Sequence, residues 1–429
     1  MLSLLAPLLA FASTDPAHAP ASDDWPHWRG PSANGVAAGP APRDFGDGEH
    51  VRWRVEVPGR GMSTPILLGE RLFVTTAVPS EPTEASAGTS APEEQSFEVH
   101  ALERATGKTL WRAVARVATP HEGYHASYGS YASASPVTDG ERLYVSFGSQ
   151  GVYAYELDGT LAWSFDPGVK LAMRNGFGEG LAPVLAGDVL VQVADQEHDS
   201  FVFALDKRTG KELWRVPRDE PTGWSTPLVT RFDGRQEVVT TGARRTRSYE
   251  PASGKLLWEA DGAGLNAIPN VLRHENLVLV MSGFREAKML ALEPPPGAED
   301  GDGGPPEAKV RWSAAKGCGY TASAVLHDGL FYSVTDRGTL TCTDAATGEA
   351  HYVEERLPRG STLKSSPVAA GDLLYLPTEA GEVHLVRLGP EYELVGTRTF
   401  ADQTFVASPA IAGGALYLRS LTQLLCVAE

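Results

Sequence analysis

Hydrophobic and polar residues alternate in short runs along most of the chain, and glycine-rich turns separate the runs. Residues 135–163 show the pattern clearly: SPVTDGERLYVSFGSQGVYAYELDGTLAW. Alternation with a period of two is typical of half-buried strands, and DG, GSQG and DGT are typical of tight turns. The segment therefore predicts four short antiparallel strands, at 135–138, 143–147, 152–157 and 161–163.

The four-strand pattern recurs along the chain. Residues 204–214, ALDKRTGKELW, nearly repeat residues 101–111, ALERATGKTLW. A second marker is a small residue followed by proline, an apolar pair, a glycine turn and an aromatic strand. Its anchor falls at Pro65, Pro136, Pro183, Pro227, Pro269, Ala324, Pro367 and Pro409. Five of the seven intervals are 42 to 47 residues, the length of a four-stranded propeller blade. We therefore predict an all-β, eight-bladed propeller with four-stranded antiparallel blades.

The two longer intervals contain insertions, at residues 79–96 and 294–308. Both are rich in Pro, Gly, Ser and acidic residues and have few large apolar side chains. Segments of this composition cannot bury enough apolar surface to fold. We expect disordered surface loops there.

A tryptophan follows the turn in most copies, at the start of the predicted outer strand. In such a hairpin Gly210 can take a positive φ, and the indole can bury against the adjoining blade. The eighth copy ends without an outer strand, and VRWRVEV at 51–57 supplies one. We expect this N-terminal strand to close the ring, which removes two exposed sheet edges. The predicted docking residues are Trp53, Trp111, Trp163, Trp214, Trp258 and Trp312, with Tyr352 in the sixth copy.

The N-terminus begins with an apolar run, residues 2–12, that is too short to span a bilayer. Small-residue A-x-A sites follow it, so residues 1–21 are expected to be a signal peptide of a secreted or periplasmic protein; the alternative is a disordered apolar tail. No cysteine follows the run, so no lipid or membrane anchor is expected. Residues 22–50, with Trp25 and Trp28, are expected to be a strap along the propeller wall, and 51–429 the propeller.

Charge and cysteine content exclude some functions. The chain has 37 basic and 54 acidic residues and a net charge of −17, which disfavours nucleic acid as a partner. Cys318, Cys342 and Cys426 are not adjacent, and buried free thiols are expected. No Ser-His-Asp set, P-loop or dinucleotide fingerprint is present, so no catalytic residues are predicted.

The AxDxxTGKxxW segment resembles the tryptophan-docking motif of the eight-bladed quinoprotein propellers. These include the pyrroloquinoline quinone alcohol dehydrogenases and the propeller subunit of the outer-membrane β-barrel assembly machinery. The chain also resembles secreted bacterial PQQ-binding-like β-propeller repeat proteins, through WPHWRGP at 25–31 and the loops 173–180 and 218–227. For a dehydrogenase, the resemblance implies a vicinal cysteine pair over the quinone, a Trp beneath it, a Glu/Asn/Asp set on Ca²⁺ and an Asp base. The vicinal pair is absent, and the fold alone does not define an activity.

Strand order places the loops from strand D to strand A, and from B to C, on one face, where a ligand is expected. Arginines there can orient an anionic or carbohydrate ligand, but they can equally form ion pairs between blades. His121 and His125 are four residues apart, yet their Gly/Ser/Tyr context indicates a loop, so no metal site is expected. The candidate ligand-binding residues are His121, His125, Arg174, Asn175, Glu179, His198, Arg244 and Arg285.

These observations favour a secreted, non-catalytic and monomeric propeller without a cofactor. Rigid rings with variable loops suit binding, so the expected partner is a protein, peptide or glycan of the cell envelope. The alternative is an oxidoreductase that depends on a metal or on pyrroloquinoline quinone with Ca²⁺.

Overall fold

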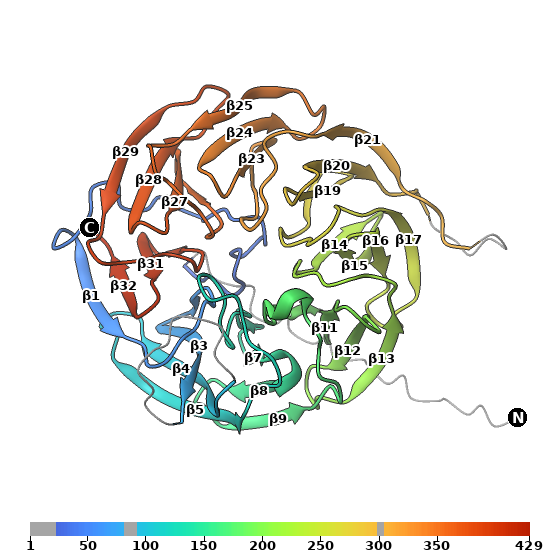
Figure 1. Ribbon diagram of the computed structural model, residues 1–429, viewed down its shortest axis with the longest axis horizontal. Coiled ribbons are helices and arrows are strands. Elements are labelled where there is room, and N and C mark those ends of the chain that lie inside the picture. Colours follow the sequence, from blue (N-terminus) through green and yellow to red (C-terminus); the bar gives the residue numbers. More distant parts are fainter. Residues whose placement is uncertain (1–22, 81–91, 298–303) are drawn as a thin grey trace, which may run out of the picture.

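The computed structural model describes residues 23–80, 92–297 and 304–429. Thirty-two strands form eight four-stranded antiparallel sheets, which are arranged as blades around a ring (Figure 1). The predicted eight-bladed propeller is thus confirmed. The predicted signal peptide lies outside the described residues. Within the described ranges, no helix has the length and apolar character needed to cross a membrane.

The chain builds each blade from the axis outwards, with strand A innermost and strand D on the rim. The first four blades have these strands: in blade 1, β2 (Ile66–Leu68), β3 (Arg71–Pro79), β4 (Gln95–Glu103) and β5 (Thr109–Ala118); in blade 2, β6 (Val137–Thr138), β7 (Arg142–Ser146), β8 (Val152–Glu156) and β9 (Leu161–Phe165); in blade 3, β10 (Val184–Ala186), β11 (Val189–Ala194), β12 (Phe201–Asp206) and β13 (Glu212–Pro217); in blade 4, β14 (Leu228–Phe232), β15 (Arg235–Thr241), β16 (Arg245–Tyr249) and β17 (Leu256–Asp261).

The remaining blades follow the same order, and two 3-10 turns lie in loops of blades 2 and 3. These elements are, in blade 5, β18 (Leu272–His274), β19 (Leu277–Ser282), β20 (Lys288–Glu293) and β21 (Lys309–Ala314); in blade 6, β22 (Val325–His327), β23 (Leu330–Val334), β24 (Thr339–Asp344) and β25 (Ala350–Arg356); in blade 7, β26 (Val368–Ala370), β27 (Leu373–Pro377), β28 (Glu382–Arg387) and β29 (Leu394–Thr399); in blade 8, β30 (Ala410–Ala412), β31 (Ala415–Arg419), β32 (Gln423–Val427) and β1 (Val51–Glu56); and the turns η1 (Gly148–Gln150) and η2 (Arg174–Gly176).

The N-terminal strand closes the ring, as predicted. Strand β1 pairs antiparallel with β32, the last strand of the chain, and so completes blade 8 (Figure 1). The Trp53 indole then reaches into blade 1, where its Nε1 donates a hydrogen bond to the Arg104 carbonyl oxygen at 3.0 Å. The closing strand therefore brings its own docking tryptophan.

Four other tryptophans dock in the same way. Their Nε1 atoms donate to carbonyl oxygens in the C–D turn of the next blade, at 2.8 to 3.0 Å: Trp111 to Leu157, Trp163 to Lys207, Trp214 to Pro251 and Trp312 to Ala345. Each ring also covers the glycine of that turn. Gly210, for example, has φ 71°, and a Cβ there would lie 2.5 Å from the Trp163 ring. This glycine is needed both for its backbone angle and for the close approach.

Trp258 occupies the predicted slot, and its ring is fully buried, but its nitrogen bonds differently. Its Nε1 donates to Glu237 Oε2 of its own blade, at 2.8 Å. The neighbouring C–D connection, between β20 and β21, carries the second insertion. Ala308, at the end of that insertion, packs in the same apolar cluster as Trp258. The insertion therefore takes the place of the usual turn.

The ends of both insertions are more ordered than predicted. Pro79 ends β3 and pairs with Gln95 at the start of β4, so 79–96 is too wide a range for a loop. In the second insertion, Glu259 bonds through its backbone to Pro306 and Ala308, at 3.1 and 2.8 Å. The sequence has too few large apolar residues there to suggest packing. Backbone pairing and the buried Ala308 nevertheless order the end of this insertion. The centres, 81–91 and 298–303, lie outside the described residues.

The repeat anchor predicted at Pro269 lies two residues later in the structure. Strand β18 begins at Leu272, so the position equivalent to the anchor proline is Val271 rather than Pro269. The neighbouring Asn270 N–H bonds Ser323 Oγ of the next blade at 2.9 Å, as the residues before other anchors do. The anchor in blade 5 is therefore defined by this bond and not by a proline.

The first half of the strap, residues 25–36, does not follow the propeller wall, contrary to the prediction. Trp25 pairs with Leu67 on β2 of blade 1, and Val36 pairs with Ala369 on β26 of blade 7. Both partners lie on innermost strands. Residues 25–36 therefore cross the centre of the ring and connect blades on opposite sides of the closure.

Arg29 fixes this crossing. Its guanidinium is fully buried and donates to the carbonyl oxygens of Ala324 and Pro367, at 2.7 and 2.8 Å, in blades 6 and 7. Burial lowers the pKa of Arg29 to about 9. The second half of the strap then runs over blade 7, where Phe45 packs against Phe400. The strap thus plugs the axis first and covers the wall afterwards.

Candidate functional site

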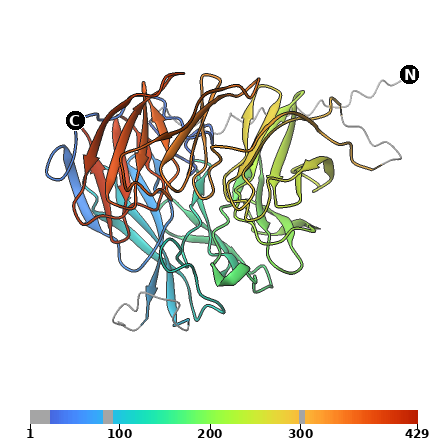
Figure 2. The same ribbon diagram turned by 45° about the horizontal axis from the view of Figure 1, so that its top comes forward.

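A cavity of about 200 Å³ lies on the propeller axis and opens on the face of the D–A loops. Figure 2 shows strands β3 and β4, in blue to cyan, projecting to one side of the ring. The cavity, here called the axial funnel, is lined by one residue from near the start of each innermost strand: Thr64, Ser135, Ala182, Thr226, Ile268, Ser323, Ser366 and Ser408.

Several of these hydroxyls brace neighbouring blades. The backbone N–H of Thr64 donates to Ser135 Oγ, that of Ser323 to Ser366 Oγ, and that of Ser366 to Ser408 Oγ, each at 2.9 Å. A serine that accepts such a bond keeps its own O–H for donation. The funnel therefore presents hydroxyl groups at six of these eight positions, all but Ala182 and Ile268, and they are here called the hydroxyl ring.

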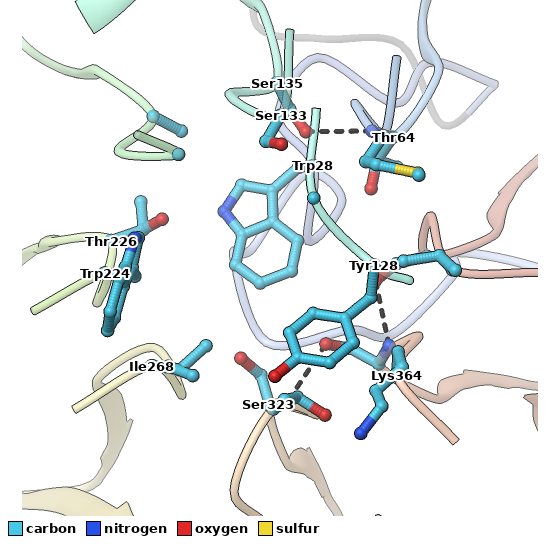
Figure 3. Close-up of a pocket in the computed structure, with 18 of the residues that line it drawn as sticks. Trp28, Thr64, Tyr128, Ser133, Ser135, Trp224, Thr226, Ile268, Ser323 and Lys364 are labelled. Atoms are coloured by element: carbon cyan, nitrogen blue, oxygen red, sulfur yellow. Dashed lines mark hydrogen bonds between the residues drawn. The ribbon is translucent and has the colours of Figure 1, made fainter. Parts of the chain in front are cut away.

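Aromatic rings make up much of the remaining lining (Figure 3). Trp28 comes from the strap, and its buried Nε1 has no hydrogen-bond partner among the described residues. Trp224 is held by a bond from its Nε1 to the Gly178 carbonyl oxygen at 2.8 Å. Tyr128 stacks on His125, with ring centroids 3.6 Å apart. Tyr320 and Phe177 complete the aromatic set.

The funnel has little free charge. Its cation, Lys364, lies 2.6 Å from Asp336 Oδ2 and 4.7 Å from the centre of the Tyr128 ring. Its carboxyl group, Glu179, is partly buried, and desolvation raises the pKa of Glu179 to about 7. Such a lining favours an uncharged ligand, because an ion would lose its hydration without gaining an unpaired partner.

Of the predicted ligand-binding residues, only Glu179 lines the funnel. His125 lies behind Tyr128, and burial together with the Lys364 charge lowers the pKa of His125. His121 lies in a smaller neighbouring cavity. Glu179 thus lines the funnel itself, His125 supports a lining residue, and His121 lines the adjoining cavity.

The other five predicted residues lie outside the funnel lining. Arg174 lies 3.3 Å from Glu197 Oε1, and Arg244 donates to the Asp219 carbonyl oxygen. Arg285 lies beside the Phe284 ring, at 5.3 Å, and is exposed. Asn175 and His198 are also exposed. The arginines therefore do not gather around a common ligand position in the described structure.

Trp28, Trp224 and the hydroxyl ring are functional residues that the sequence did not predict. The ring had a visible signal, because a small residue precedes the anchor in most copies, as in STP, SSP and ASP. Trp28 had only the WPHWRGP motif, which does not reveal that the strap crosses the axis. Trp224 belongs to the RDEPTGWSTP loop, whose sequence shows a family resemblance but does not indicate that the tryptophan lines a cavity.

A side cavity of about 30 Å³ adjoins the funnel and shares Glu179 with it. His121 and Glu122 face it from the loop between blades 1 and 2. The Met173 N–H donates to Glu122 at 3.1 Å, while burial raises the pKa of Glu122. Phe97, Tyr131 and Phe147 supply apolar walls. Two carboxyl groups and a histidine thus meet in a partly apolar recess.

Pyrroloquinoline quinone, the cofactor that the fold class suggests, does not fit this donor set. It is a tricarboxylate, and its recognition requires cations near the carboxylates. The funnel offers Lys364, which Asp336 already holds. Cys318 and Cys342 are separate, buried thiols, and burial raises the pKa of each to about 12. We therefore derive no reaction step through a quinone.

Fold and repeat together define an eight-bladed β-propeller with a repeated tryptophan-docking motif. A family model described as "Outer membrane protein assembly factor BamB" matches residues 95–266. Among solved structures, BamB from Moraxella catarrhalis is similar, with 15% identity, a TM-score of 0.55, and coverage of 83% of this chain and 98% of that chain. The predicted resemblance is thus confirmed. No curated protein matches the chain.

Two further solved structures share the fold. Quinohemoprotein alcohol dehydrogenase from Comamonas testosteroni has 12% identity and a TM-score of 0.58, and the match covers 95% of this chain and 81% of that chain. The computationally designed Ika8 protein has 12% identity and a TM-score of 0.56, with coverage of 89% and 100%. At these identities the likeness concerns the fold and leaves function to the site.

Proposed function

We propose that this chain is a non-catalytic binding module of the cell envelope, and that its axial funnel receives an uncharged segment of another protein. The observation that carries this proposal is the funnel lining. Aromatic rings and hydroxyl donors converge on the axis, while Lys364, the cation there, is already paired. Aromatic side chains are enriched where proteins bind partners, and rigid scaffolds with variable loops commonly bind through those loops.

The comparisons support a role in the envelope. The matching family model and one similar structure are named for BamB, and the description of the family model calls BamB an outer membrane protein assembly factor. Residues 1–21 have the pattern of a signal peptide, which agrees with export. A protein partner is therefore the preferred ligand.

A glycan is the second candidate, because hydroxyl donors beside aromatic rings also suit a sugar. The hydroxyl ring of Ser135, Ser366 and Ser408 is the specific observation in its favour. Photocrosslinking separates the two ligands, because only a protein ligand gives an adduct that contains additional peptide.

Site-specific photocrosslinking in intact envelopes tests the proposal. A benzoylphenylalanine probe replaces Tyr128 in the funnel, and a control probe replaces Leu110, which is 47% exposed on rim strand β5. We expect a discrete protein adduct from position 128 and none from position 110. A peptide-free glycan adduct would favour the second candidate. Equal adducts from both positions would contradict a funnel site.

A blocking variant provides the matched control. Val406→Trp adds bulk to the funnel lining, whereas Val353→Trp adds it at a position that is 43% exposed on rim strand β25. Val406→Trp should abolish the adduct from position 128, and Val353→Trp should leave it unchanged. An undiminished adduct in Val406→Trp would mean that the partner binds above the funnel.

A further inference from the structure

The side cavity brings together three potential metal ligands from two loops. A ring nitrogen of His121 and a carboxylate oxygen from each of Glu122 and Glu179 lie within 4.8 Å of one another. His121 and Glu122 come from the loop between β5 and β6, and Glu179 from the loop between β9 and β10. The cluster thus joins the D–A loops of adjacent blades.

The orientation of His121 is fixed by its surroundings. Its Nε2 lies 2.8 Å from the Leu171 carbonyl oxygen, which can only accept a hydrogen bond, so Nε2 carries the proton. Nδ1 is then the bare nitrogen. It is buried and has no hydrogen-bond partner among the described residues. Metal-ligating histidines commonly donate their other ring nitrogen to a carbonyl in this way.

The two carboxylates are also held in place. The Met173 N–H donates to Glu122, and the Ser149 N–H donates to Glu179 Oε2 at 2.6 Å. Gly148 makes room for Glu179, because a Cβ at Gly148 would lie 1.8 Å from Oε2. Neither carboxylate has a lysine or arginine within ion-pair distance in the described part of the chain. Two neighbouring carboxyl groups without a paired cation keep oxygens available to a metal ion.

We propose that His121, Glu122 and Glu179 form a binding site for a divalent transition-metal ion, with zinc as the best-suited ion. One imidazole nitrogen and two carboxylate oxygens are ordinary zinc ligands, whereas Ca²⁺ and Mg²⁺ prefer all-oxygen sites. The assignment revises the expectation of no metal, which considered His121 only with His125.

The ion would connect the two loops and stiffen one side of the funnel. Glu179 lines both cavities, so its position couples the metal site to the funnel wall. Three protein ligands leave a position open on a tetrahedral ion. The site is independent of the proposed protein partner, because it requires only residues of this chain.

Zinc titration of the full-length protein, stripped with a chelator and dialysed, tests the inference. Isothermal titration calorimetry and elemental analysis should give about one zinc ion per chain. His121→Ala and Glu122→Gln should each weaken zinc binding by about tenfold or more, since ligand loss costs at least as much as second-shell loss. The matched control is His198→Ala, which removes an exposed histidine. It should bind zinc like the wild type.

Folding is monitored in the same samples. Zinc should raise the melting temperature of the wild type and of His198→Ala, but not that of His121→Ala. Should His121→Ala fail to fold, the isosteric Glu122→Gln provides the same comparison. Absence of stoichiometric zinc binding by the wild type, or unchanged affinity in both ligand variants, would overturn the proposal. Neither result bears on the photocrosslinking test of the funnel.

Discussion

The rim and the axis of this propeller are built on different principles. On the rim, Trp111, Trp163 and Trp214 make the same bond to the same turn at successive blade junctions. On the axis, the strap crosses once and contributes Trp28 to the funnel lining. The comparison teaches that repeated tryptophans hold the rim together, whereas the aromatic residues available for recognition on the axis, such as Trp28 and Trp224, do not follow the repeat.

The geometry of a ring explains the division. Each junction between blades presents nearly the same surfaces, so one docking device can serve them all. The axis receives eight unequal loops, and each can vary without disturbing the docking contacts. The junction of blades 4 and 5 shows the limit of the rule, because the insertion before β21 changes the partner of Trp258.

The largest effect should follow from removing the segment that serves both regions. Deletion of residues 1–58 removes β1 with Trp53, together with the buried Trp25 and Arg29. It leaves the edge of β32 unpaired and empties the axis, so the free energy of unfolding should fall by at least about 3 kcal/mol. Thermal and urea unfolding measure the loss. A truncated chain that melts at the wild-type temperature would contradict both ring closure and the axial plug.

A smaller effect should separate docking from backbone strain on the rim. Gly210→Ala places a Cβ 2.5 Å from Trp163, whereas Gly234→Ala, at a similar φ of 81°, meets no atom within 4 Å. Strain alone costs about 1 kcal/mol, and overpacking adds about 1–3 kcal/mol at Gly210. Urea unfolding of the two variants gives the difference directly. Equal losses would mean that the Trp–Gly contact contributes nothing.

The second insertion should divide into two parts. Replacing 298–303 by a Gly-Asn link should change stability by less than about 1 kcal/mol, because loop-closure entropy varies slowly with length. Extending the replacement through Ala308 should cost about 1–2 kcal/mol more, since the backbone bonds to Glu259 are lost. Thermal unfolding of both variants is the measurement. A large loss from the shorter replacement would show that its residues pack.

The smallest effect should distinguish the two kinds of tryptophan. Trp163→Phe removes an indole N–H that bonds the Lys207 carbonyl, whereas Trp28→Phe removes one without a partner among the described residues. The rim variant should therefore lose about 1 kcal/mol more than the axial one. Conversely, only Trp28→Phe should weaken the funnel adduct. A larger stability loss in Trp28→Phe, together with a weaker adduct in Trp163→Phe, would contradict the roles assigned to rim and axis.

The sequence could predict the rim because its signals repeat. The docking tryptophans, the turn glycines and the missing outer strand of blade 8 all followed from comparing copies of one pattern. Predictions from the repeat were wrong where a copy departs from the common pattern. Pro269 looked like an anchor because it is a proline, while Val271 holds that position, and Ala308 gave no sign that it would pack against Trp258.

The axis could not be predicted in the same way. Trp28 precedes the repeats, and only the hydrogen bonds of Arg29 to blades 6 and 7 fix the path of the strap. The arginines that seemed to mark a ligand position instead have neighbours of their own, such as Glu197 beside Arg174. His121 and Glu179 were both chosen from the sequence, but their proximity depends on how two loops fold against each other.

Fluorine NMR of protein labelled with 5-fluorotryptophan compares the two regions in one measurement. The chain has nine tryptophans, and single Trp→Phe variants assign their signals. On addition of the partner identified by crosslinking, we predict that the signals of Trp28 and Trp224 shift while those of Trp111, Trp163 and Trp214 stay in place. Shifts confined to the docking tryptophans, with Trp28 and Trp224 unmoved, would contradict the assignment of recognition to the axis.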